Sequence, residues 1–95
     1  MKELEATYLS LYDEEADALY RFAFFRTNDH EQALDIVQES FLALWKAMRS
    51  GQRIDALRSF LYRIARNLLI DRYRKEGRAR TDSLDRYLEE GGDVA

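Results

Sequence analysis

Three long stretches of the sequence repeat apolar residues with the period of an α-helix, and no proline interrupts them. The apolar side chains of residues 4–27, 30–49 and 56–76 fall on one side of a helix in each stretch. Signals for β-strands are weak throughout the chain. Because proline is absent, nothing in the backbone chemistry prevents long uninterrupted helices. The sequence therefore predicts an all-α fold, a compact bundle of three or four helices with short connections.

Polar residues and glycine mark the expected ends of these helices. Asn28-Asp29 breaks the first apolar pattern, and Asp29 is a candidate N-cap of the second helix. Gln32, three residues later, completes a pattern that resembles a capping box. Gly51 suits the left-handed conformation that often follows a helix. Asp55 is the candidate N-cap of the third helix.

The apolar stripes of the three helices are expected to face one another and to form the core. The predicted core residues are Tyr8, Tyr12, Ala16, Leu19, Phe22, Ala23, Ala33, Ile36, Val37, Phe41, Leu44, Met48, Leu57, Phe60, Leu61, Ile64 and Leu68. A chain of 95 residues has room for one such modest core.

Residues 1–77 are expected to form this single domain, with Gly77 as the natural end of the third helix. Residues 78–95 are polar and charged, and we expect a mobile tail with one short helical turn near residues 83–90. The N-terminal part has no long apolar run, so neither a signal peptide nor a membrane span is expected. The absence of cysteine fits a reducing, cytoplasmic location.

The residue types that catalysis and cofactor binding usually require are missing from the sequence. It contains one histidine and no cysteine, which leaves no plausible zinc site and no disulfide. It also contains no glycine-rich phosphate loop, no nucleophile elbow and no HExxH pattern. We therefore expect a protein that is not an enzyme and that holds no cofactor or metal.

Charge is sorted into blocks along the chain. Residues 46–80 contain eleven basic and three acidic side chains, a net charge of +8. Residues 1–45 contain three basic and ten acidic side chains, a net charge of −7, and residues 81–95 have a net charge of −4. This separation suggests a nucleic-acid face on one helix and a different partner on another. The alternative is that the blocks merely neutralise each other inside a bundle.

The second helix has an unusual side opposite its apolar stripe. Asp35, Gln38, Glu39 and Leu42 lie there, which places an exposed leucine among carboxylates and an amide. This side either is an ordinary solvated face with one stray apolar residue or docks a basic or amphipathic helix.

The third helix combines aromatic and basic side chains on the side that we expect to lie opposite its core stripe. Tyr62, Arg66 and Tyr73 lie there, with Arg63 and Arg74 to one side. Aromatic rings stack on unpaired bases and guanidinium groups hold phosphates, so this pattern suits single-stranded nucleic acid. The alternative is a salt-bridged solvent face.

Two segments together resemble region 2 of bacterial RNA polymerase sigma factors, and most of all the extracytoplasmic-function (ECF) group. The segment Asp35-Ile-Val-Gln38-Glu39-Ser-Phe41-Leu-Ala-Leu-Trp45 resembles the region 2.2 helix. The segment Phe60-Leu-Tyr62-Arg63-Ile64-Ala65-Arg66-Asn67-Leu-Leu-Ile-Asp71-Arg72-Tyr73-Arg74 resembles regions 2.3 and 2.4. The order and spacing of the two segments make the resemblance specific, and it covers roughly residues 8–78.

The resemblance implies two sites and two partners. Region 2.2 docks on the β′ clamp helices of RNA polymerase, and regions 2.3 and 2.4 recognise and melt the promoter −10 element, mostly as unpaired non-template strand. The positions that match the polymerase contact are Asp35, Gln38, Glu39, Leu42 and Trp45. The positions that match the DNA contact are Gln52, Arg53, Tyr62, Arg63, Arg66, Asn67, Arg72 and Arg74. Among these, Tyr62 and Asn67 match positions that line the pocket for a flipped base.

The sequence also departs from the family pattern. Members of this group usually carry a second domain, region 4, and residues 78–95 correspond to the start of the connection to it. Many relatives have an aromatic residue in the loop near Gly51 and a tryptophan where Phe60 stands. The preferred promoter sequence is therefore not carried over from the family.

Two other functions stay open at this point. A sigma-like interaction module would bind polymerase or an anti-sigma factor without reading DNA. A generic helical DNA-binding protein would prefer double-stranded DNA and would not depend on Gln38 or Glu39.

Overall fold

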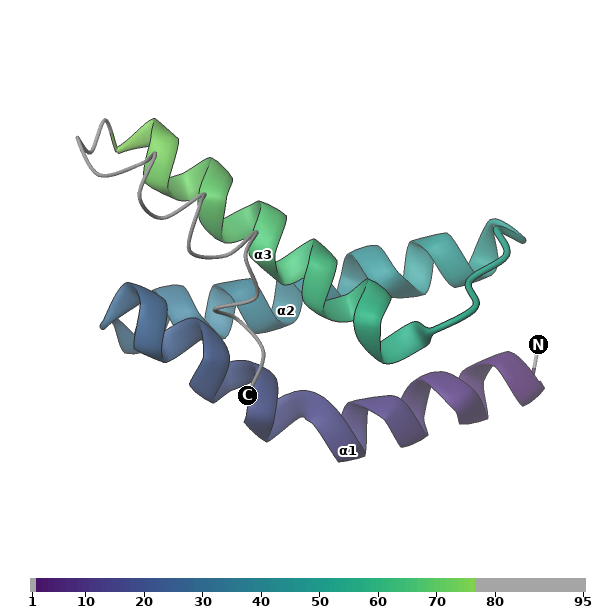
Figure 1. Cartoon of the computed structure of the whole chain (residues 1–95). Coiled ribbons are helices and arrows are strands. Elements are labelled where there is room, and N and C mark those ends of the chain that lie inside the picture. The colour runs from purple at the N-terminus through teal and green to yellow at the C-terminus, as the bar shows by residue number, and fades with distance from the viewer. Residues whose placement is uncertain (1, 77–95) are drawn as a thin grey trace.

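Three helices and two short connections make up the described structure. The computed structural model describes residues 2–76, with α1 at Lys2–Thr27, α2 at His30–Arg49 and α3 at Leu57–Lys75. The chain turns back between α1 and α2, so these helices lie antiparallel, and α3 crosses over them and contacts both (Figure 1). The predicted all-α fold is confirmed. α2 has its predicted limits, α1 begins two residues earlier than predicted, and α3 is one residue shorter at each end.

The turn between α1 and α2 forms as the sequence predicts, except for one arm of the capping box. Asn28 adopts a left-handed conformation with φ of +53°, which ends α1. Asp29 is the N-cap of α2, and its Oδ1 accepts a hydrogen bond of 3.1 Å from the backbone N–H of Gln32. The backbone N–H of Asp29 donates to Thr27 Oγ1 at 3.3 Å, so Thr27 takes the role that was predicted for the Gln32 side chain.

The connection between α2 and α3 confirms one predicted turn residue and corrects another. Gly51 has φ of +84°, a conformation that costs a side-chain-bearing residue about 1–2 kcal/mol. The predicted cap at Asp55 is wrong, because Ala56 is the N-cap of α3 and makes no side-chain cap hydrogen bond. The Asp55 carboxylate instead accepts a hydrogen bond of 3.1 Å from Arg53 Nε.

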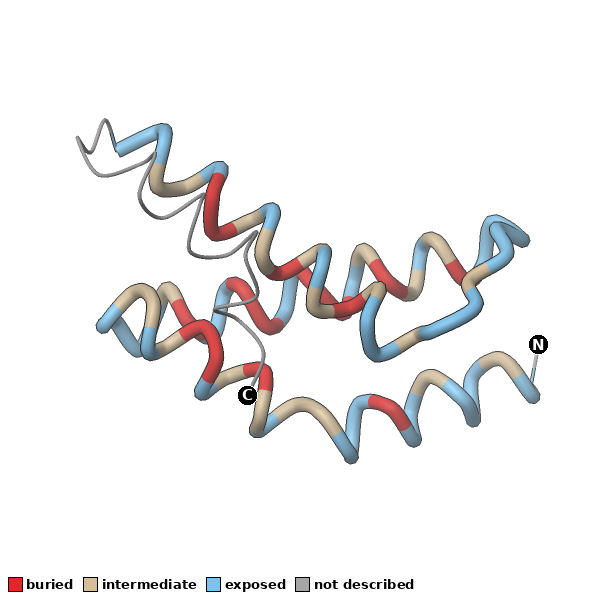
Figure 2. Tube along the Cα trace, in the orientation of Figure 1, coloured by how far each residue is buried: buried red, intermediate tan, exposed pale blue. Residues whose placement is uncertain are grey.

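The core lies where the three helices approach one another (Figure 2). Every predicted core residue of α2 is buried, and so is Ser40. In α1 the stripe is only partly correct, because Leu11 is buried although it was not predicted, while Tyr12 is 43% exposed and Tyr8 is half-buried. The N-terminal half of α1 therefore packs less deeply than its C-terminal half.

The predicted stripe of α3 is rotated from the observed one. Its buried residues are Leu61, Ala65, Leu69 and Ile70. Of the predicted set only Leu61 is fully buried, and the others are half-buried: Leu57, Phe60, Ile64 and Leu68. Because α3 contacts both α1 and α2, it buries a wider arc than one apolar stripe covers.

The aromatic and basic residues of α3 are also placed differently from the prediction. Tyr62, Arg66 and Tyr73 are half-buried on the flank beside α1, so the prediction that they lie opposite the core is wrong. The opposite, exposed side of α3 carries Arg63 and Arg74 instead.

The helices within residues 2–76 include none that is long and apolar enough to cross a membrane. The expectations for residues 77–95, including the helical turn near 83–90, lie outside the described residues.

Candidate partner and nucleic-acid surfaces

The outer face of α2 has the composition and exposure that the sequence predicts. Asp35, Gln38, Glu39 and Leu42 are all exposed, and 52% of Leu42 is accessible to solvent. Their spacing places them in one row along the helix. The row combines two carboxylates, an amide and an unpacked leucine, so it presents an apolar contact next to negative charge.

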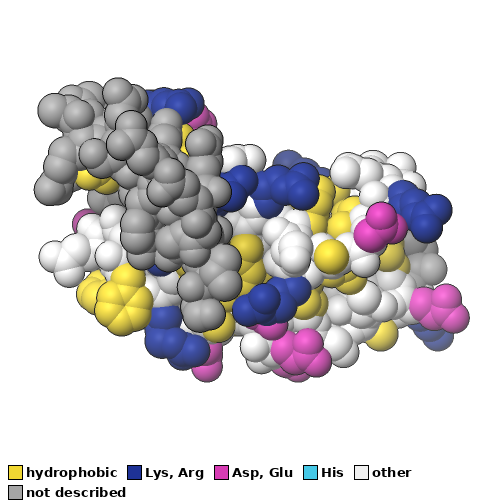
Figure 3. Space-filling model, in the orientation of Figure 1, with side chains coloured by type: hydrophobic (Ala, Val, Ile, Leu, Met, Phe, Trp, Pro, Cys, Tyr) yellow, Lys and Arg dark blue, Asp and Glu magenta, His cyan; other side chains and the backbone are white. Residues whose placement is uncertain are grey.

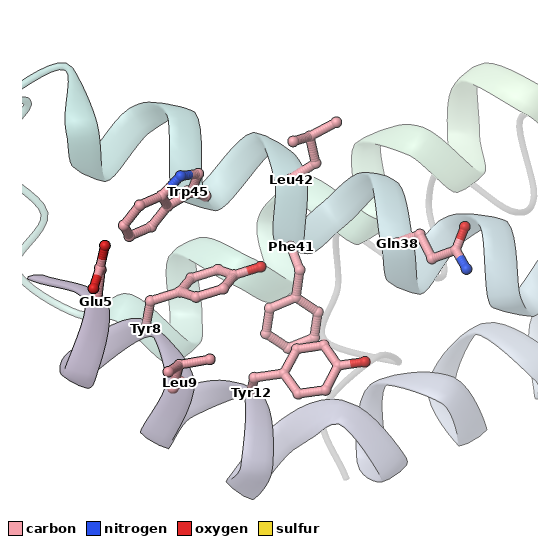
Figure 4. A pocket seen from close by; sticks show the side chains of 8 residues that line it. All are labelled: Glu5, Tyr8, Leu9, Tyr12, Gln38, Phe41, Leu42 and Trp45. Carbon is pink, nitrogen blue, oxygen red and sulfur yellow. The ribbon is translucent and has the colours of Figure 1, made fainter.

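An open groove of about 440 Å³ lies beside this row, between α1 and α2. The residues that line it are Glu5, Tyr8, Leu9, Tyr12, Gln38, Phe41, Leu42 and Trp45. Figure 4 shows Tyr8 and Tyr12 of α1 facing Trp45 and Phe41, with Leu42 and Gln38 at the α2 rim. The four α1 residues were missed as candidate site residues. Leu9 was the available signal, because it is a large apolar residue outside the predicted core stripe.

Aromatic contacts shape the groove. The Tyr8 ring lies 4.9 Å from the Trp45 ring and 6.1 Å from the Phe41 ring, measured between centroids. The Tyr12 and Phe41 ring centroids are 4.7 Å apart. Burial raises the pKa of Tyr8, and the neighbouring Tyr12 raises it further. The wall of the groove is therefore a set of mutually packed rings, which gives it a defined shape without a ligand.

A residue of the predicted DNA site and a residue of the predicted polymerase site contact each other between α3 and α2. The Arg72 guanidinium donates a hydrogen bond to the Glu39 carboxylate, and the two form a salt bridge. Their side chains are 27% and 49% exposed. Arg72, predicted to contact DNA, thus points toward the row predicted to contact polymerase.

The exposed side of α3 brings three predicted DNA residues into one line. Arg63, Asn67 and Arg74 are exposed and follow one another along the same side of the helix. Asn67 and Arg74 border an open hollow of about 460 Å³ that Ile70 also lines. Figure 3 shows basic side chains over α3, and both acidic and basic side chains along the edge that α1 forms. The two charge blocks of the sequence meet at two salt bridges, Arg58–Glu15 and Arg72–Glu39.

The two predicted loop residues, Gln52 and Arg53, are exposed. Arg53 forms a salt bridge of 3.1 Å with Asp55, in which both side chains are more than four-fifths exposed, at 91% and 84%. A salt bridge this exposed contributes little to stability, so both loop residues are accessible to a partner.

Tyr62 and Arg66 occupy the flank between α3 and α1, apart from the exposed line. The Tyr62 ring packs edge-on against Phe22, with 5.2 Å between centroids, and the Arg58 guanidinium lies 5.1 Å from the Tyr62 centroid. Arg58 also donates a hydrogen bond of 3.1 Å to Glu15. The Arg66 Nε atom is buried and has no hydrogen-bond partner among the described residues.

The electrostatics of this flank act on the Tyr62 hydroxyl. Burial raises the pKa of Tyr62 above its ordinary value of 10.0, and the Glu15 carboxylate adds to the rise. The positive charges of Arg58 and Arg21 oppose it. Tyr62 therefore stays a neutral hydrogen-bond donor well into the alkaline range.

Residues 2–76 contain no group of histidine, aspartate or glutamate side chains that could hold a metal ion. The surfaces described above consist of exposed charge, aromatic rings and apolar contact area. Such surfaces suit binding to macromolecules.

Comparison with known proteins identifies the family of this chain. The family model of sigma-70 region 2 matches residues 11–79. The chain is 41% identical to the ECF RNA polymerase sigma factor SigL of Mycobacterium tuberculosis over 66 residues, which are 68% of this chain and 37% of SigL. It is 30% identical to the ECF RNA polymerase sigma factor SigX of Bacillus subtilis over 73 residues, which are 77% of this chain and 38% of SigX.

A third relative is the ECF RNA polymerase sigma factor SigE of Mycolicibacterium smegmatis, which is 31% identical over 74 residues. That match covers 78% of this chain and 28% of SigE. The chain thus spans less than two-fifths of the length of each of these curated relatives. No solved structure matches the chain. On the evidence of the family match and these relatives, the chain belongs to the sigma-70 region 2 family, in the ECF group of sigma factors.

Proposed function

We propose that this chain docks on the β′ clamp helices of RNA polymerase and recognises and melts the promoter −10 element, so that it directs transcription initiation. It acts by binding and is not an enzyme. The family match and the names of its relatives, which are RNA polymerase sigma factors, support the general role.

The observation that carries the proposal is the exposure of two different surfaces on one small domain. The acidic row of α2 ends at the exposed Leu42, and α3 exposes the line of Arg63, Asn67 and Arg74. One domain can then hold a basic protein partner and a nucleic-acid strand at the same time, and each surface has the charge opposite to that of its partner.

On the polymerase side, a basic coiled coil would contact Asp35, Gln38 and Glu39, and it would cover Leu42 and the edge of Trp45. Burying a leucine that is half exposed supplies apolar contact energy, and the surrounding carboxylates set orientation and association rate. This combination is typical of a protein interface, in which apolar contacts lie inside a polar rim.

On the DNA side, the exposed line of α3 and the loop residues Gln52 and Arg53 would follow the phosphates of the unpaired strand. A flipped base would stack on Tyr62 at the flank beside α1. Such a base has to displace Arg58 from the ring, and the freed guanidinium can then hold a phosphate. Extruding the base costs a few kcal/mol, which stacking and edge hydrogen bonds offset.

A specific observation also favours the second candidate, a sigma-like module that binds polymerase or an anti-sigma factor without reading DNA. Two of the predicted DNA residues are less accessible than the sequence indicates, because Arg72 forms a salt bridge with Glu39 and Arg66 has its Nε atom buried. Fewer cations are then available to phosphates than the sequence alone predicts.

The test measures binding of this chain to an isolated β′ clamp-helix fragment by calorimetry. Leu42→Arg places a positive charge against a basic partner and removes apolar contact area, so it should weaken binding at least tenfold. Phe25→Arg is the control for the added positive charge, because Phe25 is an exposed apolar residue of α1, at 79%, and does not belong to the row on α2. Equal binding by both variants would refute docking through α2.

The second arm separates the two candidates by adding a single-stranded −10 oligonucleotide to the complex. Arg63→Ala should lower affinity for the oligonucleotide and reduce its salt dependence by about one counterion. Leu42→Arg, by contrast, should leave the salt dependence of DNA binding unchanged. A complex that binds the fragment but shows no DNA binding at any salt concentration would establish the interaction module instead.

A further inference from the structure

We propose that Glu15 of α1 selects which bases stack on Tyr62, and that it favours bases with an exocyclic amino group. The inference rests on the proposed binding of unpaired DNA and extends it to a helix for which the sequence predicted no contact with nucleic acid. The residues that carry it are Glu15, Arg58 and Tyr62, which lie together where α1 contacts the N-terminal part of α3.

The Arg58 guanidinium connects the carboxylate of α1 to the aromatic ring of α3. Its Nε atom donates a hydrogen bond of 3.1 Å to Glu15 Oε2. Its Cζ atom lies over the Tyr62 ring, 5.1 Å from the centroid. A flat cation over an aromatic face occupies the place that a stacked base would take. A base that stacks on this face of Tyr62 therefore takes the guanidinium away from the carboxylate.

The two partners of this salt bridge differ strongly in their access to water. The Arg58 side chain is 62% exposed, whereas the Glu15 side chain is only 14% exposed. The exposed guanidinium can move aside at little cost, because water replaces its contacts. The shielded carboxylate loses one of its hydrogen-bond donors at that moment, and an unmet acceptor with little access to water is unfavourable. The incoming base therefore has to supply a new donor.

The Tyr62 ring is held beside this carboxylate. It packs edge-on against the buried Phe22, with 5.2 Å between centroids. Burial contributes most to the raised pKa of Tyr62, and Glu15 raises it further through its charge and through hydrogen bonding. The carboxylate thus lies at the hydroxyl edge of the ring, where the edge of a stacked base can reach it.

The chemistry of a carboxylate then decides which base fits. An ionised carboxylate accepts hydrogen bonds and donates none. Cytosine and adenine present an amino group at their pairing edge, which can replace the guanidinium as the donor. Uracil and thymine present the carbonyl oxygen O4 there instead, so two acceptors would face each other. A site with a shielded polar group rejects ligands that leave this group unpaired, so Glu15 disfavours both of these bases.

The test measures binding of the full chain to oligodeoxycytidine and to oligodeoxyuridine of equal length. Both are pyrimidine strands of similar stacking surface, and they differ in the donor and acceptor pattern of the base edge. A repeated base offers the same edge in every register, so the preferred promoter sequence does not enter. Fluorescence anisotropy of labelled strands at low salt and neutral pH gives the two affinities, and their ratio is the readout.

Glu15→Gln should lower the ratio of cytidine to uridine affinity about fivefold. The amide keeps the size of the side chain, accepts from the amino group of cytosine, and can also donate to O4 of uracil. Glu14→Gln is the matched control, because Glu14 is the neighbouring carboxylate of α1, is exposed, and loses the same charge on substitution. It should raise both affinities by the same factor and leave their ratio unchanged.

A second measurement uses the native chain and so does not depend on the folding of a variant. The Nε–H group of Arg58 is visible by NMR and reports on its hydrogen bond to Glu15. Saturation with oligodeoxycytidine should shift this signal, because the stacked base displaces the guanidinium. An unchanged signal in the saturated complex would refute stacking at this face of Tyr62.

The outcomes separate this inference from the proposed function. If the native chain binds both strands and Glu15→Gln leaves their ratio unchanged, DNA binding stands and the role of Glu15 is refuted. A purely structural salt bridge gives this result, because weaker packing of α1 on α3 alters both affinities alike. Equal changes of the ratio in Glu15→Gln and Glu14→Gln would refute the role of Glu15 as well. If the native chain binds neither strand, the proposed DNA binding fails together with this inference.

Discussion

Single side chains at the flank of α1 and α3 serve packing and the candidate DNA site at once. Tyr62 is the clearest case, because its ring packs on the buried Phe22 while its hydroxyl lies among the charges of Glu15, Arg58 and Arg21. The sequence pattern marked Tyr62 as a candidate for base stacking but placed it on the wrong side of the helix. Its surroundings depend on α1, and no local pattern in α3 contains that information.

The raised pKa of Tyr62 predicts a pH dependence of stability. The folded state holds the hydroxyl proton more tightly than the unfolded state, so this residue stabilises the fold below pH 10.0. That stabilisation is lost as the pH rises through the raised pKa of the folded state. Tyr62→Phe cannot ionise, so its free energy of unfolding should fall less than that of the native chain between neutral and strongly alkaline pH. Urea denaturation at several pH values measures this difference, and parallel curves for the two proteins would contradict the assignment.

Helix ends show how closely local sequence determines an element. α2 begins and ends where the sequence predicts, because Asp29 accepts a hydrogen bond from Gln32 and Gly51 supplies a left-handed residue after the helix. α3 begins at Leu57, and its N-cap, Ala56, makes no side-chain hydrogen bond, although Asp55 stands one position earlier. Both aspartates have the composition of a cap, and only the backbone path decides which one acts as a cap.

Because only Asp29 caps a helix, its replacement should destabilise the fold more than replacement of Asp55. Asp29→Ala should lower the free energy of unfolding by about 1 kcal/mol, because it leaves a backbone N–H of the first turn of α2 without its partner. Asp55→Ala is the matched control and should change it by less than about 0.5 kcal/mol, since its salt bridge with Arg53 is almost fully exposed. Denaturant titrations of both variants give the two values. A larger loss for Asp55→Ala would contradict the observed start of α3.

At the scale of the whole molecule, packing rather than ion pairing holds the three helices together. Two salt bridges join helices, Arg58–Glu15 between α3 and α1 and Arg72–Glu39 between α3 and α2. Both include exposed side chains, so solvent screens them. The buried residues of all three helices form one cluster at the centre of the bundle. The stability of the fold therefore does not depend on neutralisation between the two oppositely charged blocks.

If packing contributes more than ion pairing, removing a buried side chain should cost more stability than breaking an interhelical salt bridge. Leu44 is fully buried at 0% exposure, so Leu44→Ala should lower the free energy of unfolding by about 2–5 kcal/mol. A double-mutant cycle on Glu39 and Arg72 should give a coupling energy of at most about 1 kcal/mol, decreasing with added salt. Chemical denaturation measures both quantities. A coupling energy larger than the cost of Leu44→Ala would mean that the interhelical salt bridges dominate stability.

Local patterns in the sequence were sufficient for the helices, the turns at Asn28 and at Gly51, the apolar residues on the buried side of α2 and the exposed row that contains Leu42. Periodicity and capping act over a few residues, so each segment contains the information that these features need. The division of charge between the two halves of the chain is likewise a property of the sequence itself.

Tertiary packing determined which side of α3 is buried and most of the geometry of the candidate sites. It rotated the buried side of α3 toward Ala65 and Leu69, joined Arg72 to Glu39, and left Leu9 and Tyr12 uncovered beside Trp45. Each of these features depends on how closely two helices approach and at what angle. The side-chain volumes of several segments set that approach together, so no single stripe of apolar residues predicts it.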